Sequence, residues 1–339
     1  MYSCENNNTE RRRQKELFVI VTAGATYLDI DAYACMVATE ELLRLQGVNA
    51  IAYSDASCNY SVCSSLQNAN QIHNDLPSDC LPENSEFIIV DVSDPTYLEK
   101  SVPLDRVIAV YDHHAGFEDY WTSRIGDNAH IEFIGAAATL IWREWKKAGL
   151  ADKMSNTTVR LLAAAILDNT LNLMSANTTD EDRETFAELC KLGGIDGAWC
   201  ASYFSEVQKS IEADLKNALL GDVKTVWDST VLPAHIGQLA VWDSEKILCR
   251  LPEIRRLFDE RFPCWMLNII DIGKRFSCFV CSGDKYQNKL EKIFNLSVNG
   301  GVAKTSEPYL RKEIIKTARL YQQKMETAPA VQKEVDRKW

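Results

Sequence analysis

The chain lacks the long apolar segments that mark membrane proteins. No run of about 18 or more apolar residues occurs among its 339 residues. The polar, Asn-rich stretch from Met1 to Lys15 also lacks the apolar centre of a secretory signal peptide. We therefore expect no membrane partner, and we interpret residues 1–15 as a disordered lead-in.

Positive charge is scarce as well. The 37 Lys and Arg residues are outnumbered by 48 Asp and Glu residues, which gives a net charge of −11. Such a chain is a poor binder of nucleic-acid backbones, so no long nucleic acid is expected as a partner. An acidic surface is instead compatible with a site that collects metal cations.

Cysteine is not scarce, but its arrangement lacks a zinc-binding pattern. Cys278 and Cys281 form a C-x-x-C motif inside an apolar run, and no second ligand pair lies at a suitable spacing. We therefore expect these cysteines to pack in a core. Eleven cysteines without a secretory signal favour reduced thiols and a cytoplasmic location.

Short apolar runs alternate with helical patterns over the first half of the chain. Strands are predicted over residues 17–21, 48–53, 87–90, 107–111 and 131–134. Helices are predicted over residues 32–46, 62–73 and 157–167, and from about residues 135 and 179 onward. This alternation predicts a doubly wound, mostly parallel α/β domain that extends to about residue 190.

One stretch places chemistry-bearing side chains at the end of a predicted strand. The apolar run that begins at Val107 ends in Asp112, His113 and His114, although the chain has only five histidines. In parallel sheets, ligands bind at the carboxyl ends of the strands. The sequence therefore predicts a functional site here, and the alternative is a polar turn with two chance histidines.

Further acids follow other predicted elements. Asp29 and Asp31 open the first helix, Asp91 follows the third strand, and Asp168 ends a later helix. Each alone is compatible with helix capping or simple exposure to solvent. As a group they would meet at one edge of the sheet, where several ionised carboxylates require cations. Carboxylates with one imidazole suit Mn²⁺ or Mg²⁺, and a pair of such ions favours hydrolysis of a phosphate ester or anhydride.

These motifs resemble those of the DHH phosphoesterase superfamily. Asp112-His113-His114 matches the name-giving motif, while Asp29-x-Asp31, Asp91 and the Asp168 segment are similar to the first, second and fourth motifs. The metal ligands that the resemblance implies are Asp29 for one ion, Asp31 for the other, Asp91 for both, and His113 and Asp168 for the second site. It also implies two catalytic residues, namely His114 in contact with substrate phosphate and Asp112 as the group that orients the imidazoles.

The C-terminal part resembles a second domain named DHHA2. Gly221 to Lys224 and Ile236 to Leu239 are similar to its Asp-x-Lys and Ile-x-Gln segments, and Ser306 to Lys312 to a degraded Ser-Arg-Lys motif. This domain occurs in the subfamily of manganese-dependent inorganic pyrophosphatases, exopolyphosphatases and prune-like proteins. The resemblance implies that the substrate-binding cations are Lys224, Arg311 and Lys312. The alternative is that these side chains are ordinary surface cations.

One position departs from the pyrophosphatase pattern. A metal-binding His is expected four residues before Asp29, and Ala25 occupies that position. Alanine cannot ligate a metal, so the first metal site is expected to be weakened. The departure favours the exopolyphosphatase and prune-like branch, which also lacks this His.

The resemblance also suggests how the chain is divided. We expect a DHH metal-binding domain over 16–192, a hinge and helical linker over 193–222, a smaller α/β DHHA2-like domain over 223–330, and a tail over 331–339. The glycines between Gly193 and Ala201 interrupt the helical pattern and predict the hinge. The active site would lie in the cleft between the two domains. The sequence does not define the oligomeric state, and a homodimer is one alternative.

Three functions are compatible with these features. The first is a metal-dependent phosphohydrolase that acts on a small inorganic or nucleoside polyphosphate, with Mn²⁺ or Mg²⁺ as its cofactor. The second is a phosphodiesterase for cyclic dinucleotides or short oligonucleotides, which normally carries a Gly-Gly-Gly-His-like motif that Asn299-Gly300-Gly301-Val302 does not match. The third is a regulatory protein that binds a phosphate ligand with little turnover. The preserved ligands of the second metal site favour the first function.

Overall fold

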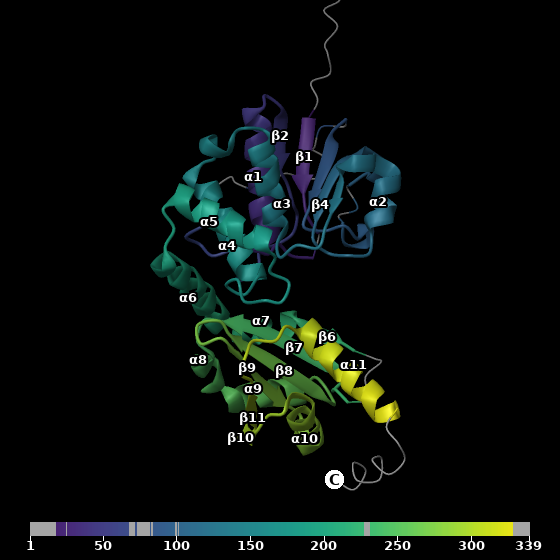
Figure 1. Cartoon of the computed structure of the whole chain (residues 1–339), viewed down its shortest axis with the longest axis vertical. Coiled ribbons are helices and arrows are strands. Elements are labelled where there is room, and N and C mark those ends of the chain that lie inside the picture. Colours follow the sequence, from purple (N-terminus) through teal and green to yellow (C-terminus); the bar gives the residue numbers. More distant parts are fainter. Residues whose placement is uncertain are drawn as a thin grey trace, which may run out of the picture.

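The computed structural model describes residues 18–24, 26–67, 72, 82, 84–98, 100, 102–226 and 231–327. The predicted lead-in and tail therefore lie outside the described residues, and so does Ala25. The described chain forms two α/β parts, one above the other in Figure 1, with helix α6 (Gly197–Ala213) running from the first to the second.

The first part is built on a five-stranded, entirely parallel sheet with the strand order β2-β1-β3-β4-β5. Its strands are β1 (Phe18–Thr22), β2 (Asn49–Ala52), β3 (Glu86–Val90), β4 (Val107–Asp112) and β5 (Ala129–Ile131). Nearly every residue of β1 and β3 is buried, because both faces of the sheet are covered. The predicted parallel α/β architecture is confirmed.

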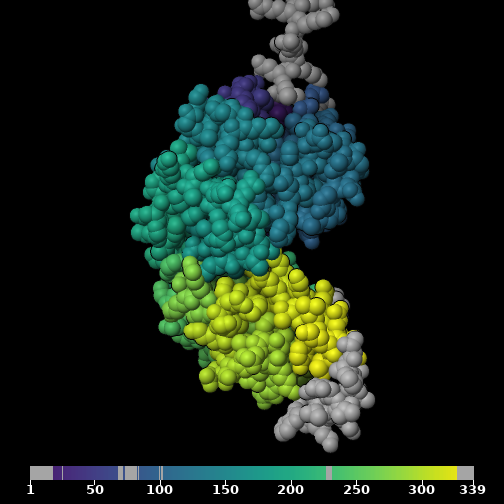
Figure 2. All heavy atoms as spheres, viewed as in Figure 1, coloured from purple at the N-terminus to yellow at the C-terminus, as the bar shows by residue number. Residues whose placement is uncertain are grey.

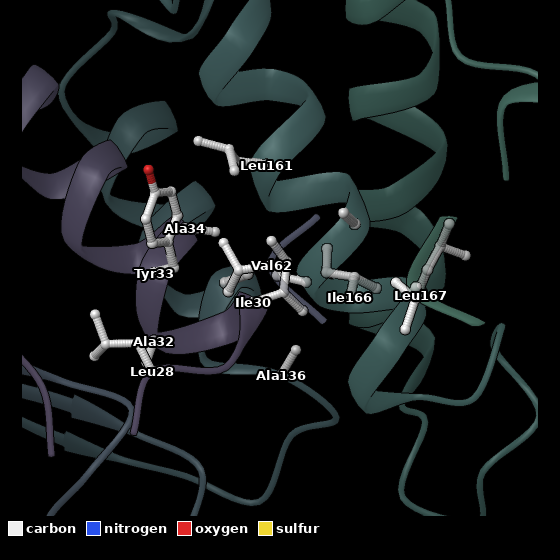
Figure 3. Close-up of a cluster of buried hydrophobic side chains, with 14 of the residues drawn as sticks. Leu28, Ile30, Ala32, Tyr33, Ala34, Val62, Ala136, Leu161, Ile166 and Leu167 are labelled. Atoms are coloured by element: carbon white, nitrogen blue, oxygen red, sulfur yellow. The ribbon is translucent and has the colours of Figure 1, made fainter. Parts of the chain in front are cut away.

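Helices cover both faces of this sheet. On one face lie α1 (Ile30–Leu45), α3 (Ala137–Lys147), α4 (Asn156–Asn169) and α5 (Asp180–Gly193), and on the other lies α2 (Glu118–Ile125). Successive strand residues point to opposite faces, so Val19 and Val21 join the core under α1 and α4 while Ile20 packs with Trp121 of α2. Figure 3 shows part of the larger core, where Ile30 of α1 lies near Ile166 of α4.

Two sequence predictions differ from the structure. The helix expected over 62–73 is wrong where the structure describes it, because residues 62–67 form turns and bends. This stretch is rich in Ser and Asn, whose side chains compete for backbone hydrogen bonds and favour turns. The fifth strand lies at Ala129–Ile131, before the predicted range, so only Ile131 is shared.

The second part contains a six-stranded mixed sheet with the order β10-β11-β9-β8-β7-β6. Its strands are β6 (Val223–Thr225), β7 (His235–Val241), β8 (Trp265–Asp271), β9 (Phe276–Cys281), β10 (Val298–Asn299) and β11 (Val302–Lys304). Strands β7 and β8 are parallel, and the other pairs are antiparallel. Cys278 and Cys281 are buried and unpaired on β9, which confirms that they are core cysteines.

Helices α6 to α11 accompany the second sheet in the part of the chain that the structure describes. After α6 come α7 (Leu215–Gly221), α8 (Ser244–Leu248), α9 (Leu251–Asp259), α10 (Gly283–Phe294) and α11 (Arg311–Thr327). The described residues of the first part also include the single 3₁₀ turns η2 (Pro95–Tyr97), η3 (Leu104–Arg106), η4 (Gly126–Asn128) and η5 (Ala151–Lys153). None of the helices in the described residues is both long and apolar enough to cross a membrane.

Candidate metal centre and interdomain cavity

The predicted ligands follow the carboxyl ends of neighbouring strands. Asp91 comes directly after β3, and His113 and His114 come directly after β4, which pairs with β3. Asp29 caps α1, the helix that follows β1. Because the strands are parallel, these ends share one edge of the sheet, where ligand sites of such folds are found.

Asp31 lies in the first turn of α1 and is fully buried. Its Oδ2 accepts a hydrogen bond from the N–H of Ala137 at 2.8 Å and one from Asn169 Nδ2 at 2.5 Å. Its Oδ1 accepts from the N–H of Ala138 at 2.9 Å, at the start of α3. Burial raises the pKa of Asp31, partly offset by the nearby imidazole of His113. Hydrogen bonds from α3 and α4 therefore hold the carboxylate of Asp31 in place even without a cation.

Asp29 serves as the N-cap of α1, as the sequence allowed. Its Oδ1 accepts from the N–H groups of Asp31 at 3.1 Å and Ala32 at 3.0 Å. Asp29 can cap the helix and bind a metal ion at the same time, because both capping hydrogen bonds end on Oδ1 and leave Oδ2 for a cation. That residue also lines the cavity described below.

His113 is held with one ring nitrogen directed at the acids. Its Nδ1 lies 3.2 Å from the carbonyl oxygen of Ile134, which can only accept a hydrogen bond. That contact places the ring proton on Nδ1 and leaves Nε2 available to bind a cation. Nε2 lies 3.4 Å from Asp91 Oδ1 and 4.0 Å from Asp31 Oδ2.

Two features of Asp91, its backbone conformation and its buried side-chain oxygen, are energetically unfavourable. Its backbone adopts a φ of +57°, a left-handed conformation that an Asp tolerates better than most residues. Its Oδ1 is buried and accepts no hydrogen bond. Burial, followed by the negative charges of Asp31 and Asp29, raises the pKa of Asp91 well above its ordinary value. A cation at this oxygen would remove the penalty.

Asp112 accepts hydrogen bonds from the two histidines that follow it. It is fully buried, and its Oδ1 accepts from the N–H of His113 at 2.7 Å and the N–H of His114 at 3.1 Å. The same oxygen lies 2.8 Å from His114 Nδ1. Burial alone would raise the pKa of Asp112, but the hydrogen bonds and charges of His114, Ser93 and His113 together outweigh burial and lower it. The same hydrogen bond raises the pKa of His114, whose side chain is 64% exposed.

Asp168 closes the group at the C-terminal end of α4. Its Oδ1 accepts a hydrogen bond from the hydroxyl of Tyr203 at 3.0 Å. Burial raises the pKa of Asp168 to about 7, opposed by the Tyr203 hydrogen bond and reinforced by Asp29 and Asp31. The contribution of Asp29 and Asp31 to this pKa indicates that Asp168 lies near both acids.

The described residues thus bring the predicted ligands together. Atoms of Asp91, His113 and His114 that can bind a metal all lie within 4.8 Å of one another. Oδ2 of Asp31 lies 4.0 Å from Nε2 of His113, whereas Asp29 and Asp168 lie outside this group of three, and the charges of Asp29 and Asp31 act on both Asp91 and Asp168. The ligand set is carboxylates with imidazole, and the unpartnered buried oxygen of Asp91 fits a hard divalent cation such as Mn²⁺ or Mg²⁺.

A cavity of about 490 Å³ adjoins this cluster. It is lined by residues of the first part, including Asp29, Asp91 and His114, and by residues of the second part, including Asp222 and Lys224. Lys224 lies on β6 and is exposed. The cavity therefore lies between the two parts, and Figure 2 shows an indentation between them on the side away from α6.

The other two predicted cations do not line this cavity. The guanidinium of Arg311 is buried, and its Nη2 lies 2.5 Å from Asp222 Oδ1. Its Nη1 donates to the carbonyl oxygens of Asp222 at 2.7 Å and Ile236 at 3.2 Å. Lys312 is exposed on the first turn of α11. Arg311 therefore contacts the Asp222–Lys224 segment in this arrangement.

Sequence reasoning missed three residues of the site. Tyr203 supports Asp168 from α6, Asn169 donates to Asp31, and Tyr27 lines the cavity. A signal existed for Asn169, since it is adjacent to Asp168 and shares its helix end. No local signal marked Tyr203, because its contact with Asp168 spans 35 residues of chain.

Comparison with known proteins finds manganese-dependent inorganic pyrophosphatases among the relatives of this chain. No family model matches the chain. A manganese-dependent inorganic pyrophosphatase of Methanothrix thermoacetophila is 25% identical over 247 residues, which cover 68% of this chain and 76% of the relative. A manganese-dependent inorganic pyrophosphatase of Bacillus subtilis is 23% identical over 304 residues, which cover 84% and 92%.

A solved structure shares the fold. A Methanococcus jannaschii protein assigned to the family II inorganic pyrophosphatases superposes with a TM-score of 0.57 and 19% identity, covering 90% of this chain and 99% of that chain. Fold and site together define a two-part α/β protein with a carboxylate and imidazole centre at the edge of a parallel sheet. The relatives confirm the resemblance to the manganese-dependent inorganic pyrophosphatases of the DHH superfamily.

Proposed function

We propose that this chain is a divalent-metal-dependent hydrolase that cleaves phosphoanhydride bonds of a small inorganic or nucleoside polyphosphate. The observation that supports it best is the buried, unpartnered Oδ1 of Asp91, 3.4 Å from the free Nε2 of His113. An oxygen and a nitrogen in this relation are suited to a shared cation. The names of the two curated relatives support the same reaction.

The ligands follow the roles that the resemblance implied. Asp29 would hold one Mn²⁺ or Mg²⁺ ion, Asp31 the other, and Asp91 both, with His113 and Asp168 completing the second site. When bound, such ions polarise phosphoryl oxygens and lower the pKa of water. The hydrogen bonds from Ala137 and Ala138 to Asp31 hold that carboxylate in place throughout.

Other side chains act on the substrate. His114 keeps its proton more readily than a free imidazole because Asp112 holds its Nδ1, so its Nε2 can donate to a phosphoryl oxygen. Lys224 brings a positive charge to the opposite wall of the cavity. Together they would balance the charge that builds up on the phosphoryl group during cleavage.

Movement of the second part would complete the site. In our proposal the domains extend over 16–192 and 223–330, and the hinge lies between Gly193 and Ala201. Gly194 ends α5 in a left-handed conformation, and α6 begins at Gly197. Closure about this junction would bring the cations near the start of α11, Arg311 and Lys312, toward the phosphates and exclude water.

A phosphate-release screen tests the proposal. Chelator-treated protein is supplied with Mn²⁺, Mg²⁺ or Co²⁺ and with pyrophosphate, tripolyphosphate, longer polyphosphate, nucleotides and cyclic dinucleotides. We expect release from a short polyphosphate that depends on the metal. Cleavage of cyclic dinucleotides alone would favour a phosphodiesterase, and no turnover on any compound would overturn the hydrolase proposal.

A further inference from the structure

The interdomain cavity carries more than charged groups. Besides its acids and Lys224, three aromatic residues line it, namely Tyr27, Tyr97 and Phe117. All three come from loops or short turns beside the metal-binding edge of the first sheet. Inorganic phosphate chains offer nothing for an aromatic ring to bind, because every surface oxygen is charged or strongly hydrated.

The exposure of two of these rings is unusual for the molecule. The side chain of Tyr27 is 49% exposed and that of Tyr97 is 57% exposed. In the described part of the chain, only six large hydrophobic side chains are exposed. Two of those six therefore line one cavity. Exposed aromatic surface at a cavity commonly marks a binding site.

The two tyrosines belong to adjoining segments. The backbone of Gly24, three residues before Tyr27, packs against the carbonyl of Tyr97, so that a Cβ at Gly24 would lie 3.6 Å from that oxygen. Both tyrosines line the same cavity as Asp29 and Asp91, so one bound molecule can reach the rings and the acids.

The size of the cavity points the same way. Its volume of about 490 Å³ lies within the range of pockets that hold drug-sized ligands, roughly 300–1,000 Å³, and pyrophosphate is much smaller. Asp29, Asp91 and His114 of the first part and Lys224 of the second part line it and can serve phosphates and their cations. The three aromatic rings of the same cavity supply stacking surface, which binds any nucleobase with little regard to its identity.

We infer that the substrate carries an aromatic base, so that this site takes a nucleoside polyphosphate whose base stacks on Tyr97 and Tyr27 while its phosphates enter the metal centre. The inference rests on the proposed function for the reaction itself. It adds the substrate class and two specificity-determining residues.

The experiment compares substrates that differ only in the base. Adenosine 5′-tetraphosphate and inorganic tetrapolyphosphate are supplied with Mn²⁺, and the ratio of their kcat/KM values is measured. We expect the ratio to fall about 10-fold in Tyr97→Ala and in Tyr27→Ala, mainly through KM for the nucleotide. Tyr97→Phe should retain the ratio, because it keeps the ring.

Phe133→Ala is the matched control, since this ring is 77% exposed and does not line the cavity. It should leave the ratio unchanged. An unchanged ratio in both tyrosine variants would overturn the inference, and so would a wild-type enzyme that does not prefer the nucleotide.

A binding measurement separates this inference from the hydrolase proposal. If no compound is hydrolysed, saturation-transfer NMR with adenosine 5′-monophosphate and Mg²⁺ still reports on the rings. Transfer to the base protons that Tyr97→Ala abolishes would support the stacking site without turnover. Absence of transfer to the base in the wild-type protein would overturn it.

Discussion

At the scale of single residues, the centre depends on carboxylates that are unfavourable without cations. Asp91 is the extreme case, because it combines a left-handed backbone, a buried oxygen without a partner and raised pKa. Such a residue lowers stability unless a ligand compensates. Asp91 comes directly after β3, which lies between β1 and β4 in the sheet. It is therefore well placed to share a cation with residues that follow either neighbouring strand.

Replacing Asp91 therefore has two opposite effects. Asp91→Asn should abolish metal-dependent phosphate release and raise the stability of the metal-free protein by about 1 kcal/mol, because one of several like charges is removed. Activity assays and denaturant unfolding in chelator measure the two effects. Asp105→Asn, at an exposed acid in η3, is the control and should change neither. Full activity in Asp91→Asn would contradict the ligand assignment.

Much of the site could be predicted at this scale. Asp91, Asp112 and His113 follow apolar runs, and the edge at which parallel strands end is fixed by the fold. The carbonyl of Ile134 that orients His113 could not be predicted, because any backbone can provide one. The consequence of Ala25 also stays a prediction, since that residue lies outside the described residues.

At the scale of elements, α6 links the candidate centre to the second part. Its Tyr203 is buried and stacks on Trp199 with ring centroids 6.2 Å apart, while its neighbour Phe204 stacks on Trp242 beyond β7. The hydroxyl of Tyr203 lies within hydrogen-bonding distance of both Asp168 and the carbonyl of Ser61. One helix thus contacts a proposed ligand and the second sheet.

Tyr203→Phe should weaken Mn²⁺ binding about 10-fold, because partners that orient metal ligands are typically worth 10–100-fold in affinity. Titration calorimetry with Mn²⁺ measures this directly. Tyr60→Phe removes a comparable hydroxyl contact, to Asp214 at the α6–α7 junction, and should leave the affinity unchanged. Equal Mn²⁺ affinity in Tyr203→Phe and wild type would show that the hydroxyl does not orient Asp168.

The Arg311–Asp222 pair joins the start of α11 to β6. If it positions Lys224, then Asp222→Asn and Arg311→Lys should each raise KM for pyrophosphate several-fold, and the double variant should be no worse than either. Steady-state kinetics give the comparison, with Lys316→Ala on the exposed face of α11 as the control. An unchanged KM in both single variants would show that the pair does not position Lys224.

At the scale of the whole molecule, the two sheets are less independent than the sequence suggested. Composition and motifs predicted two units, and two sheets are present. A continuous apolar core nevertheless runs from Val19 and Leu162 through Phe204 and Val207 to Trp265. Sequence patterns could predict each sheet, since strand periodicity is local, but they could not predict that α6 would join the cores.

This shared core predicts how the protein responds to metal. If Mn²⁺ binds only the folded state, as we propose, one site at 100 times its dissociation constant adds about 2.7 kcal/mol of stability. Because the core is continuous, we expect one calorimetric unfolding transition that moves to higher temperature as a whole, by at least a few degrees.

Asp91→Asn provides the matched comparison in the same calorimeter. Its transition should begin at a higher temperature in chelator than that of the wild type and should not respond to Mn²⁺, since the shared ligand is gone. Two wild-type transitions, of which Mn²⁺ moves only one, would contradict a continuous core. In that case the metal would stabilise the first sheet alone, and α6 would act as a flexible tether between two independently folding units.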